Sequence, residues 1–213
     1  MHTTYDYVPP SQDSSQVLIV FHGLGATADD LISVVSFAKN YHLYFFQAPD
    51  RIMSLFNQIP CPAWFTWEKH FSFTQRNETE MDLIASQIRS VLMQKHDINS
   101  IEIHALGFSQ GGVMALRMSS RVPLRSVAFL SSFYDQAHIQ DLNLKETDLF
   151  ISHSKSDQVV PSTLSLDFVK RIGDQTGRVM IHSYPHMGHG INAELIKDYE
   201  VFLKLYDKSI TIS

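Results

Sequence analysis

Short apolar runs separated by helix-like stretches are the feature that most restricts how this chain can fold. The runs are rich in valine, isoleucine and phenylalanine. They span residues 16–21, 42–47, 100–106, 125–131, 148–152 and 178–184. Runs of this length without polar alternation are typical of strands that are buried on both faces of a parallel sheet.

Helical patterns lie between or after several of these runs. In residues 77–95 the apolar residues recur at steps of three and four, and Asn77 followed by Glu80 resembles a capping box. Pro161 stands where the first turn of a helix tolerates proline. The other helical patterns cover residues 28–39, 161–172 and 195–206.

Strands that alternate with helices of this length predict an α/β fold. We expect a doubly wound, mostly parallel sheet of about six to seven strands with helices on both faces. No repeat, low-complexity tract or flexible linker divides the sequence, which predicts a single domain over residues 1–213. In such sheets ligands bind beyond the carboxyl ends of the strands. The loops at these ends should therefore carry the functional residues.

The charge and cysteine content exclude several classes of function. The chain has 17 lysines and arginines against 22 acidic residues and a net charge of −5, which gives no electrostatic reason to expect nucleic acid or an anionic membrane as a partner. Cys61 is the one cysteine, so an internal disulfide is impossible. No signal-peptide pattern and no apolar stretch of transmembrane length is present. We expect a soluble cytoplasmic protein.

The sequence "GFSQG" places Ser109 between an expected strand and an expected helix. This matches the pattern G-x-S-x-G in the strand, sharp turn and helix context that the motif requires. Gly107 and Gly111 supply the small neighbours that a strained turn needs. A serine held there, at a helix N-terminus, could act as a nucleophile. The alternative is a structural turn in which Ser109 only caps the helix.

A serine nucleophile needs a base, and the base needs an acid to orient it. In this fold the acid and then the histidine follow the serine along the chain. Asp157, after the run at 148–152, and His189, in "MGHG", meet that order. Asp135 is an alternative acid and His186 an alternative base. Two further histidines, His22 and His153, are expected to brace loops.

No metal or cofactor is predicted. His182, His186 and His189 are close in sequence, but Pro185 and the strand-to-loop context deny them a shared helical face. No cysteine or paired acid completes a tetrahedral set. The Gly-x-Gly of residues 23–25 lacks the third glycine or the lysine of a nucleotide-binding loop.

Two further segments are candidates for substrate contacts. The backbone N–H groups of Leu24 and Gln110 are the candidate donors to an oxyanion, since one follows an early strand and the other follows Ser109. The segment 49–76 is long and apolar, so it could line a groove for an acyl chain or pack as a satellite core. Its aromatic residues are Phe56, Trp64, Phe65, Trp67, Phe71 and Phe73.

Five motifs in this order resemble the α/β-hydrolase superfamily, and within it the small carboxylesterases similar to acyl-protein thioesterases and lysophospholipases. They are "FHGLGAT", "CPAWFTW", "GFSQGG", "SKSDQVVP" and "MGHG". The resemblance implies Ser109, Asp157 and His189 as the triad and Leu24 and Gln110 as the oxyanion hole. It also implies a substrate groove near Trp64, for which Trp64 and Phe65 are the candidate residues.

The chain departs from the usual pattern of that family at four positions. They are Ala26 in place of aspartate, Thr66 in place of an acid, and Ser132 and Ser154 in place of glycine. None belongs to the expected triad. All four lie in loops that should form the groove, so they bear on substrate preference.

The resulting hypothesis is a serine hydrolase that cleaves carboxylic esters or thioesters with an apolar acyl group through an acyl-enzyme intermediate. Its substrate would be a small-molecule or lipid-like acyl ester, with an acylated protein as a further candidate. We expect a monomer or homodimer. The rival class is a non-catalytic ligand-binding or interaction protein that retains the fold. A peptidase or a long-chain lipase is the runner-up among enzymes, but no insertion large enough for an extensive lid follows residues 125–131.

Overall fold

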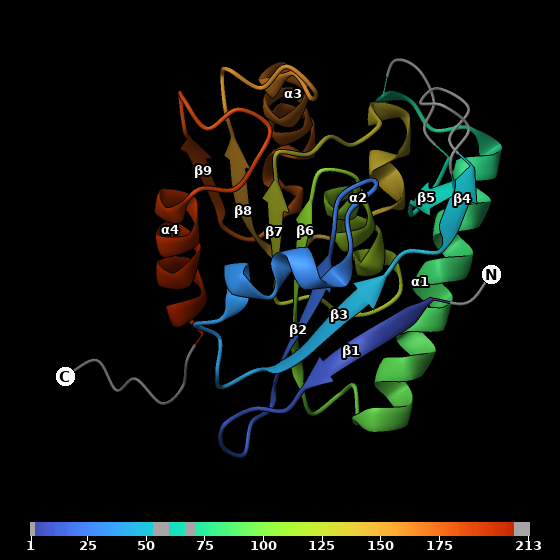
Figure 1. Ribbon diagram of the computed structural model, residues 1–213, viewed down its shortest axis with the longest axis vertical. Helices are drawn as coiled ribbons and strands as arrows, with labels where there is room; N and C mark the ends of the chain where they lie inside the picture. The colour runs from blue at the N-terminus through green and yellow to red at the C-terminus, as the bar shows by residue number, and fades with distance from the viewer. Residues whose placement is uncertain (1–2, 53–59, 67–70, 207–213) are drawn as a thin grey trace.

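The computed structural model describes residues 3–52, 60–66 and 71–206. Within them the main sheet has seven strands in the order β1-β3-β2-β6-β7-β8-β9 (Figure 1). Every neighbouring pair is parallel except β1 and β3. The predicted doubly wound, mostly parallel sheet is therefore confirmed. The strands are β1 (Thr4–Val8), β2 (Gln16–Phe21), β3 (His42–Gln47), β6 (Glu102–Phe108), β7 (Ser126–Leu130), β8 (Asp148–His153) and β9 (Val179–Ser183).

The edge strand β1 was not among the predicted strands. It pairs antiparallel with β3. Four of its five residues are exposed, and Tyr5 is half-buried. Its sequence, TYDYV, alternates aromatic and polar residues and does not form an apolar run. Such a strand needs only one packed face, so a search for fully buried runs misses it.

The central strands send alternate side chains to opposite faces of the sheet. In β2, Val17, Ile19 and Phe21 enter one hydrophobic cluster, and Leu18 and Val20 enter the other. All six residues of β2 are buried, as predicted for a strand that is covered on both sides. The period of two along the strand thus builds two cores from one sheet.

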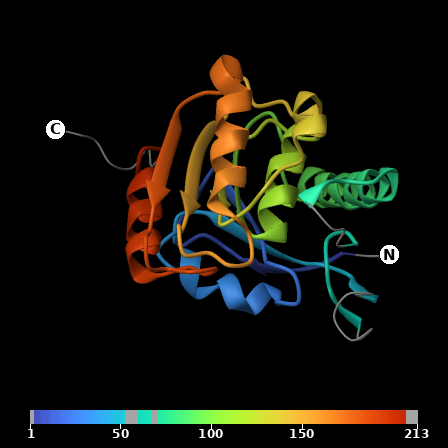
Figure 2. The same cartoon turned by 90° about the horizontal axis from the view of Figure 1, so that it is seen from above.

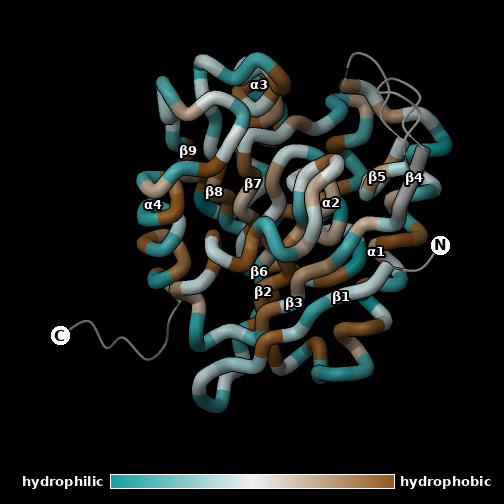
Figure 3. The backbone as a smooth tube through the Cα atoms, in the orientation of Figure 1, coloured by the Kyte–Doolittle hydropathy of each residue, from teal (hydrophilic) through white to brown (hydrophobic). Residues whose placement is uncertain are grey.

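Helices cover both faces of this sheet. In Figure 2, α1, α2 and α3 lie on one side, and α4 lies on the other together with the short turns that follow β2. The helices are α1 (Gln75–Lys95), α2 (Gln110–Arg117), α3 (Ser162–Ile172) and α4 (Ala193–Lys204). In Figure 3, hydrophobic and hydrophilic stretches alternate along the tube of α4. The expected apolar stripe of this helix is buried.

The start of α1 differs from the sequence-based prediction. Thr74 is the N-cap, and its side chain accepts a hydrogen bond from the N–H of Asn77, while the Asn77 side chain accepts one from the N–H of Thr74. The capping box is thus formed by Thr74 and Asn77, and the prediction of Asn77 and Glu80 was wrong. Glu80 instead accepts a hydrogen bond from the N–H of Thr66 (3.0 Å). Thr74, Asn77 and Glu80 are spaced three residues apart, so the spacing of a capping box occurs twice in succession. Spacing alone does not tell the two pairs apart.

The predicted helix over residues 28–39 was also wrong. This segment forms two 3₁₀ turns, Ala28–Leu31 and Ser33–Val35. Its apolar face is nevertheless buried, as expected from the pattern. Ala28, Leu31 and Val34 stand three residues apart, and this spacing aligns side chains in a 3₁₀ helix. The β-branched residues and serines of "LISVVS" also lower the propensity for an α-helix.

Shorter elements complete the fold. The strands β4 (Asp50–Ile52) and β5 (Pro60–Pro62) form a separate antiparallel pair. Further 3₁₀ turns span Met118–Ser120, Gln136–Asp141 and Gly173–Gln175. Across the described ranges, no helix combines the length and the apolar character that a bilayer crossing requires.

A buried histidine joins three strands of the sheet. His104 is fully buried in β6, its Nε2 donates to Gln16 Oε1 (2.8 Å) and its Nδ1 accepts from Ser126 Oγ (2.7 Å). This arrangement uses the single proton of a neutral imidazole. Burial lowers the pKa of His104 to about 3. Below the ordinary histidine pKa, the unfolded chain therefore binds a proton at this residue and the folded chain does not.

We expect His104 to make the protein less stable in acid. Because its folded pKa lies below the unfolded value of 6.5, its contribution to the unfolding free energy falls by about 1.4 kcal/mol per pH unit as the pH drops below 6.5. The variant His104→Gln should lose this part of the slope, whatever its stability at neutral pH. Urea unfolding at several values between pH 4 and 7 measures it, and equal slopes in both proteins would contradict it.

Candidate active site

Ser109 occupies a strained turn at the carboxyl end of β6. Its backbone has φ of 53° and ψ of −121°, and it is the residue that precedes α2. A positive φ is uncommon in a residue other than glycine and is characteristic of functional turns. The Ser109 N–H donates to the carbonyl of Leu130 at the end of β7 (2.9 Å). The turn is thereby tied to the neighbouring strand.

The glycines around Ser109 are required by close backbone packing. A Cβ atom on Gly107 would lie 2.1 Å from the carbonyl oxygen of Gly111 in α2. A Cβ atom on Gly111 would lie 2.1 Å from the carbonyl oxygen of Phe21 in β2. The predicted reason for glycine at these two positions is therefore confirmed: the strand and the helix approach too closely for any side chain.

The structure brings Ser109, His189 and Asp157 together. His189 Nε2 lies 3.1 Å from Ser109 Oγ, and His189 Nδ1 lies 2.8 Å from Asp157 Oδ2. The three residues come from the loops after β6, β8 and β9, which end at the same edge of the sheet (Figure 1). The Phe108 ring lies against the His189 ring, with centroids 5.0 Å apart. The imidazole is thus held between a hydroxyl and a carboxylate.

Asp157 is arranged to stay ionised. Its Oδ1 accepts the N–H groups of Val159 (2.8 Å) and Val160 (2.9 Å), and its Oδ2 faces His189. Burial by itself would raise the pKa of Asp157, but the hydrogen bonds from His189, Val160 and Val159 outweigh it and hold this pKa below its ordinary value. A carboxylate in this state fixes the His189 tautomer with the proton on Nδ1.

His153 braces the loop that carries Asp157. Its Nε2 donates to the carbonyl of Val160 (2.7 Å) and lies 3.4 Å from Asp157 Oδ2, while its Nδ1 is 2.8 Å from Ser165 Oγ. Burial lowers the pKa of His153, partly opposed by the bond to Val160. His22 similarly joins the loop after β2 to the backbone at Ala48. Both contacts are of the bracing kind expected from the sequence.

The alternative acid and base lie elsewhere. Asp135 caps the turn at 136–141 and accepts the N–H of Phe73 (2.6 Å). His186 is exposed, and His182 pairs with Asp198 (3.2 Å). The geometry therefore favours Asp157 and His189 over Asp135 and His186.

A pair of hydroxyls connects the Asp157 loop to the His189 loop. Ser154 Oγ and Ser156 Oγ lie 2.9 Å apart, and both accept the N–H of Gly188, at 3.1 and 3.2 Å. Gly188 has a positive φ of 70°. Ser154 is one of the four positions at which the chain departs from the pattern it resembles, and a glycine there could not make this contact, because it has no hydroxyl.

The candidate oxyanion donors flank Ser109. The loop of Leu24 is held by the N–H of Gly25, which donates to the carbonyl of Pro62 (2.8 Å). Gln110 begins α2, where a backbone N–H has no acceptor within the helix. Its side chain accepts the N–H of Trp64 (2.8 Å) and donates to the carbonyl of Phe65 (2.9 Å). The Gln110 side chain thus also fixes the segment that carries Trp64 and Phe65.

Trp64 and Phe65 belong to the hydrophobic core. Their exposed fractions are 0% and 2%, and Trp64 Nε1 donates to the carbonyl of His22 (2.7 Å). Phe73 packs beside them, with its ring 5.6 Å from that of Phe65. These contacts support the core-packing alternative for this segment, and the role of Trp64 and Phe65 in binding substrate stays a prediction. Phe56 and Trp67 lie outside the described residues.

A cavity of about 500 Å³ opens beside Ser109. Its walls are mostly apolar and are formed by Gly23, Leu24, Ala26, Phe108, Ser109, Gln158, Val159 and His189. Sequence reasoning singled out Leu24 for its N–H but missed Phe108, Gln158 and Val159 as wall residues. All three lie within two residues of Ser109 or Asp157 in the sequence, and this closeness was the available signal. Ala26, another of the four positions that depart from the resembled pattern, contributes only a methyl group to this wall.

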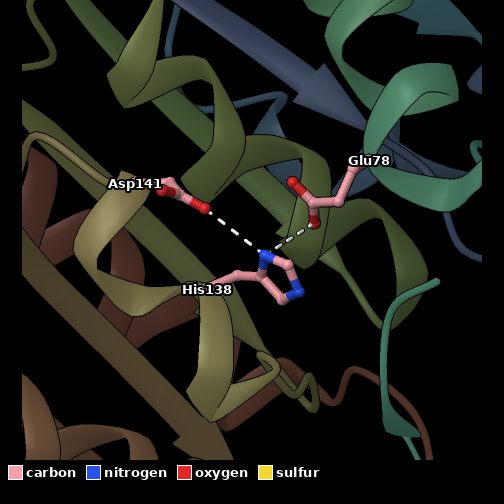
Figure 4. A group of neighbouring side chains, drawn as sticks. All are labelled: Glu78, His138 and Asp141. Carbon is pink, nitrogen blue, oxygen red and sulfur yellow. Dashed lines mark hydrogen bonds and ion pairs between the residues drawn. The ribbon is translucent and has the colours of Figure 1, made fainter. Parts of the chain in front are cut away.

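A second cluster of ionisable residues lies away from this cavity. His138 Nδ1 is 3.5 Å from Glu78 Oε1 and 3.3 Å from Asp141 Oδ2 (Figure 4). In the described parts of the chain, this is the group of three side chains whose spacing would suit a metal ion. Arg117 already pairs with Glu78 (2.8 Å) and with Asp82 (2.7 Å), so the carboxylates have a cationic partner from the protein itself. The arrangement is explained as an ion-pair network that ties α1 to α2.

Comparison with known proteins places the chain in a family. Residues 3–206 match the family model described as Phospholipase/Carboxylesterase. The chain belongs to this family. Acyl-protein thioesterase 1 of Neurospora crassa is 28% identical over 237 residues, with 95% of this chain and 93% of that protein covered. The protein of the same name from Gibberella zeae is 27% identical over 221 residues, with 92% of each covered.

Solved structures show the same fold. Zea mays acyl-protein thioesterase 2 has a TM-score of 0.81 at 20% identity, with 95% of this chain and 98% of that chain covered. A Bacillus cereus carboxylesterase has a TM-score of 0.75 at 18% identity, with 98% and 95% covered. The family member described here is thus a hydrolase with the α/β-hydrolase fold, and hydrolysis of an ester or thioester bond is its general chemistry.

The close packing of Gly111 makes a direct prediction. In Gly111→Ala the added methyl group would meet the Phe21 backbone, so α2 must shift from β2, and we expect a loss of about 3 kcal/mol or more in unfolding free energy. Urea unfolding followed by circular dichroism measures it. Gly190→Ala is the control, because the nearest atom to its Cβ lies at 3.8 Å. A Gly111→Ala protein as stable as this control would contradict the packing argument.

Proposed function

We propose that Ser109, His189 and Asp157 form the catalytic triad of a serine esterase or thioesterase. The observation that carries the proposal is the His189 imidazole, which contacts Ser109 Oγ through Nε2 and Asp157 Oδ2 through Nδ1. An imidazole held this way can take the serine proton and have its charge stabilised by the carboxylate. Each group then has one role in a single proton path.

The proposed reaction has two halves. His189 Nε2 accepts the proton of Ser109 as its Oγ bonds to the carbonyl carbon, and the N–H groups of Leu24 and Gln110 bind the oxyanion. His189 then gives that proton to the leaving alcohol or thiol, which departs and leaves the acyl group on Ser109. A water deprotonated by His189 attacks the acyl-enzyme, the bond to Ser109 breaks, and the serine regains its proton. The products are a carboxylic acid and an alcohol or thiol.

The cavity supports an acyl group of apolar character. Leu24, Phe108 and Val159 contribute apolar walls next to Ser109, and Val159 is 56% exposed although it is a large apolar residue. An exposed apolar side chain at a cavity mouth is available to contact ligand. Because the curated relatives are acyl-protein thioesterases, an acylated protein is included among the candidate substrates. A monomer or homodimer and a cytoplasmic location remain predictions.

Loss of the Ser109 hydroxyl should abolish turnover. We expect Ser109→Ala to lower kcat for short p-nitrophenyl esters by at least on the order of 1000-fold, because no nucleophile remains. Ser152→Ala is the matched control, since Ser152 is also a buried serine and its hydroxyl has no hydrogen-bond partner among the described residues. Equal ester hydrolysis by wild type and Ser109→Ala would rule out the proposed mechanism.

The same variants separate an enzyme from a binding protein that retains the fold. A fluorophosphonate probe labels only an activated serine, so we expect labelling of wild type and Ser152→Ala but not of Ser109→Ala. An unlabelled wild-type protein that still binds acyl compounds would instead favour the non-catalytic alternative.

The apolar wall predicts a dependence on acyl length. Val159→Thr keeps the shape of the side chain but places a hydroxyl in the cavity, so kcat/KM for octanoyl esters and thioesters should fall by about threefold to tenfold. The values for acetyl substrates, which are too short to need this wall, should stay the same. Turnover across chain lengths with both proteins measures this, and an equal loss for acetyl and octanoyl substrates would contradict it.

A further inference from the structure

The hydroxyl of Ser132 contacts the backbone of the proposed nucleophile. Ser132 is fully buried, and its Oγ donates to the carbonyl oxygen of Ser109 at 2.6 Å. The same oxygen accepts the N–H of Gly112 at 2.9 Å. The Ser109 carbonyl is therefore held by two donors, one from the helix and one from the loop after β7.

This carbonyl belongs to the same peptide unit as the N–H of Gln110. No cis peptide bond occurs in the described residues, so the Ser109 carbonyl and the Gln110 N–H point in opposite directions in one plane. A hydrogen bond that fixes the oxygen also fixes the direction of the N–H. It further polarises the amide, which makes the N–H a stronger donor.

The local packing holds Ser132 in place. The Ser131 backbone has φ of 44°, and its N–H donates to the carbonyl of Ser152 at 2.9 Å. A Cβ on Gly112 would lie 2.4 Å from Ser132 Oγ, so the absence of a side chain at Gly112 makes the space for this hydroxyl. The hydroxyl and the glycine fit each other closely.

We propose that Ser132 is a positioning residue of the oxyanion hole. It acts through the Ser109–Gln110 peptide and does not touch the reacting atoms. The role requires a hydroxyl at this position, because glycine or alanine there would have no side-chain donor. The proposal rests on the proposed function, in which the Gln110 N–H binds the oxyanion.

Steady-state kinetics test this role. The proteins are wild type, Ser132→Ala, Ser132→Gly and the control Ser152→Ala, with one p-nitrophenyl ester. We expect kcat to fall by about tenfold in both Ser132 variants and KM to stay unchanged. The fall is smaller than the roughly 100- to 1000-fold cost of removing an oxyanion donor, because the Gln110 N–H remains present. Ser152→Ala should match wild type.

A transition-state analogue separates positioning from a merely structural effect. An alkyl trifluoromethyl ketone adds to Ser109 and places its oxyanion in the hole, so its inhibition constant should rise in the Ser132 variants by the same factor as kcat falls. Unchanged kcat and inhibition constant in both Ser132 variants would overturn the proposal. A rise in KM alone, with kcat retained, would overturn it as well.

A readout without turnover distinguishes this proposal from the proposed function. The amide proton resonance of Gln110 should move upfield in Ser132→Ala and Ser132→Gly, because its peptide loses polarisation, and should stay in place in Ser152→Ala. An unmoved resonance in both Ser132 variants would overturn the role of Ser132. A moved resonance in a protein without esterase or thioesterase activity would support the contact and reject the proposed function.

Discussion

The contact between bare backbones at Gly107 and Gly111 is the constraint on which the site depends. With no side chain at either position, α2 lies directly against β6 and β2, and the connecting residue takes a positive φ. Ser109 is that residue, so its side chain stands at the sheet edge. The next residue, Gln110, begins α2 with a backbone N–H that has no acceptor within the helix. The close packing of the two glycines thereby brings the Ser109 hydroxyl next to the unpaired N–H groups at the start of α2.

The order of strands supplies the other groups. Because β6, β7, β8 and β9 are consecutive and parallel, the loops that follow them open at one edge. The loop after β8 carries Asp157 and the loop after β9 carries His189, while the loop after β7 carries Ser132. Residues that are 80 positions apart in sequence thus meet at hydrogen-bonding distance. The strand order determines which loops lie side by side, and the residues in these loops determine the chemistry of the site.

Much of this arrangement could be predicted from sequence. The central buried strands are predictable because parallel strands leave continuous apolar runs, but β9, expected to be buried on both faces, is an edge strand whose residues are half-buried or exposed. Ser109 is predictable from G-x-S-x-G between a strand and a helix, and Asp157 and His189 from their order in the loops after two later strands. The segment 28–39 and the cap of α1 were missed because spacing alone does not distinguish a 3₁₀ turn or a shifted register. The buried state of Trp64 depends on hydrogen bonds to Gln110 and His22, which are distant in sequence. Local patterns carry no information about such partners.

The hydroxyl pair of Ser154 and Ser156 has a mechanical consequence. Because both oxygens hold the Gly188 N–H, the segments before Asp157 and before His189 are coupled and should be displaced as one body. Small movements of α3 or α4 would then change the distance from these two segments to Ser109 more than the distance between Asp157 and His189. Asp157 and His189 would keep their alignment through thermal fluctuations, and the distance from the imidazole to the Ser109 hydroxyl would vary most.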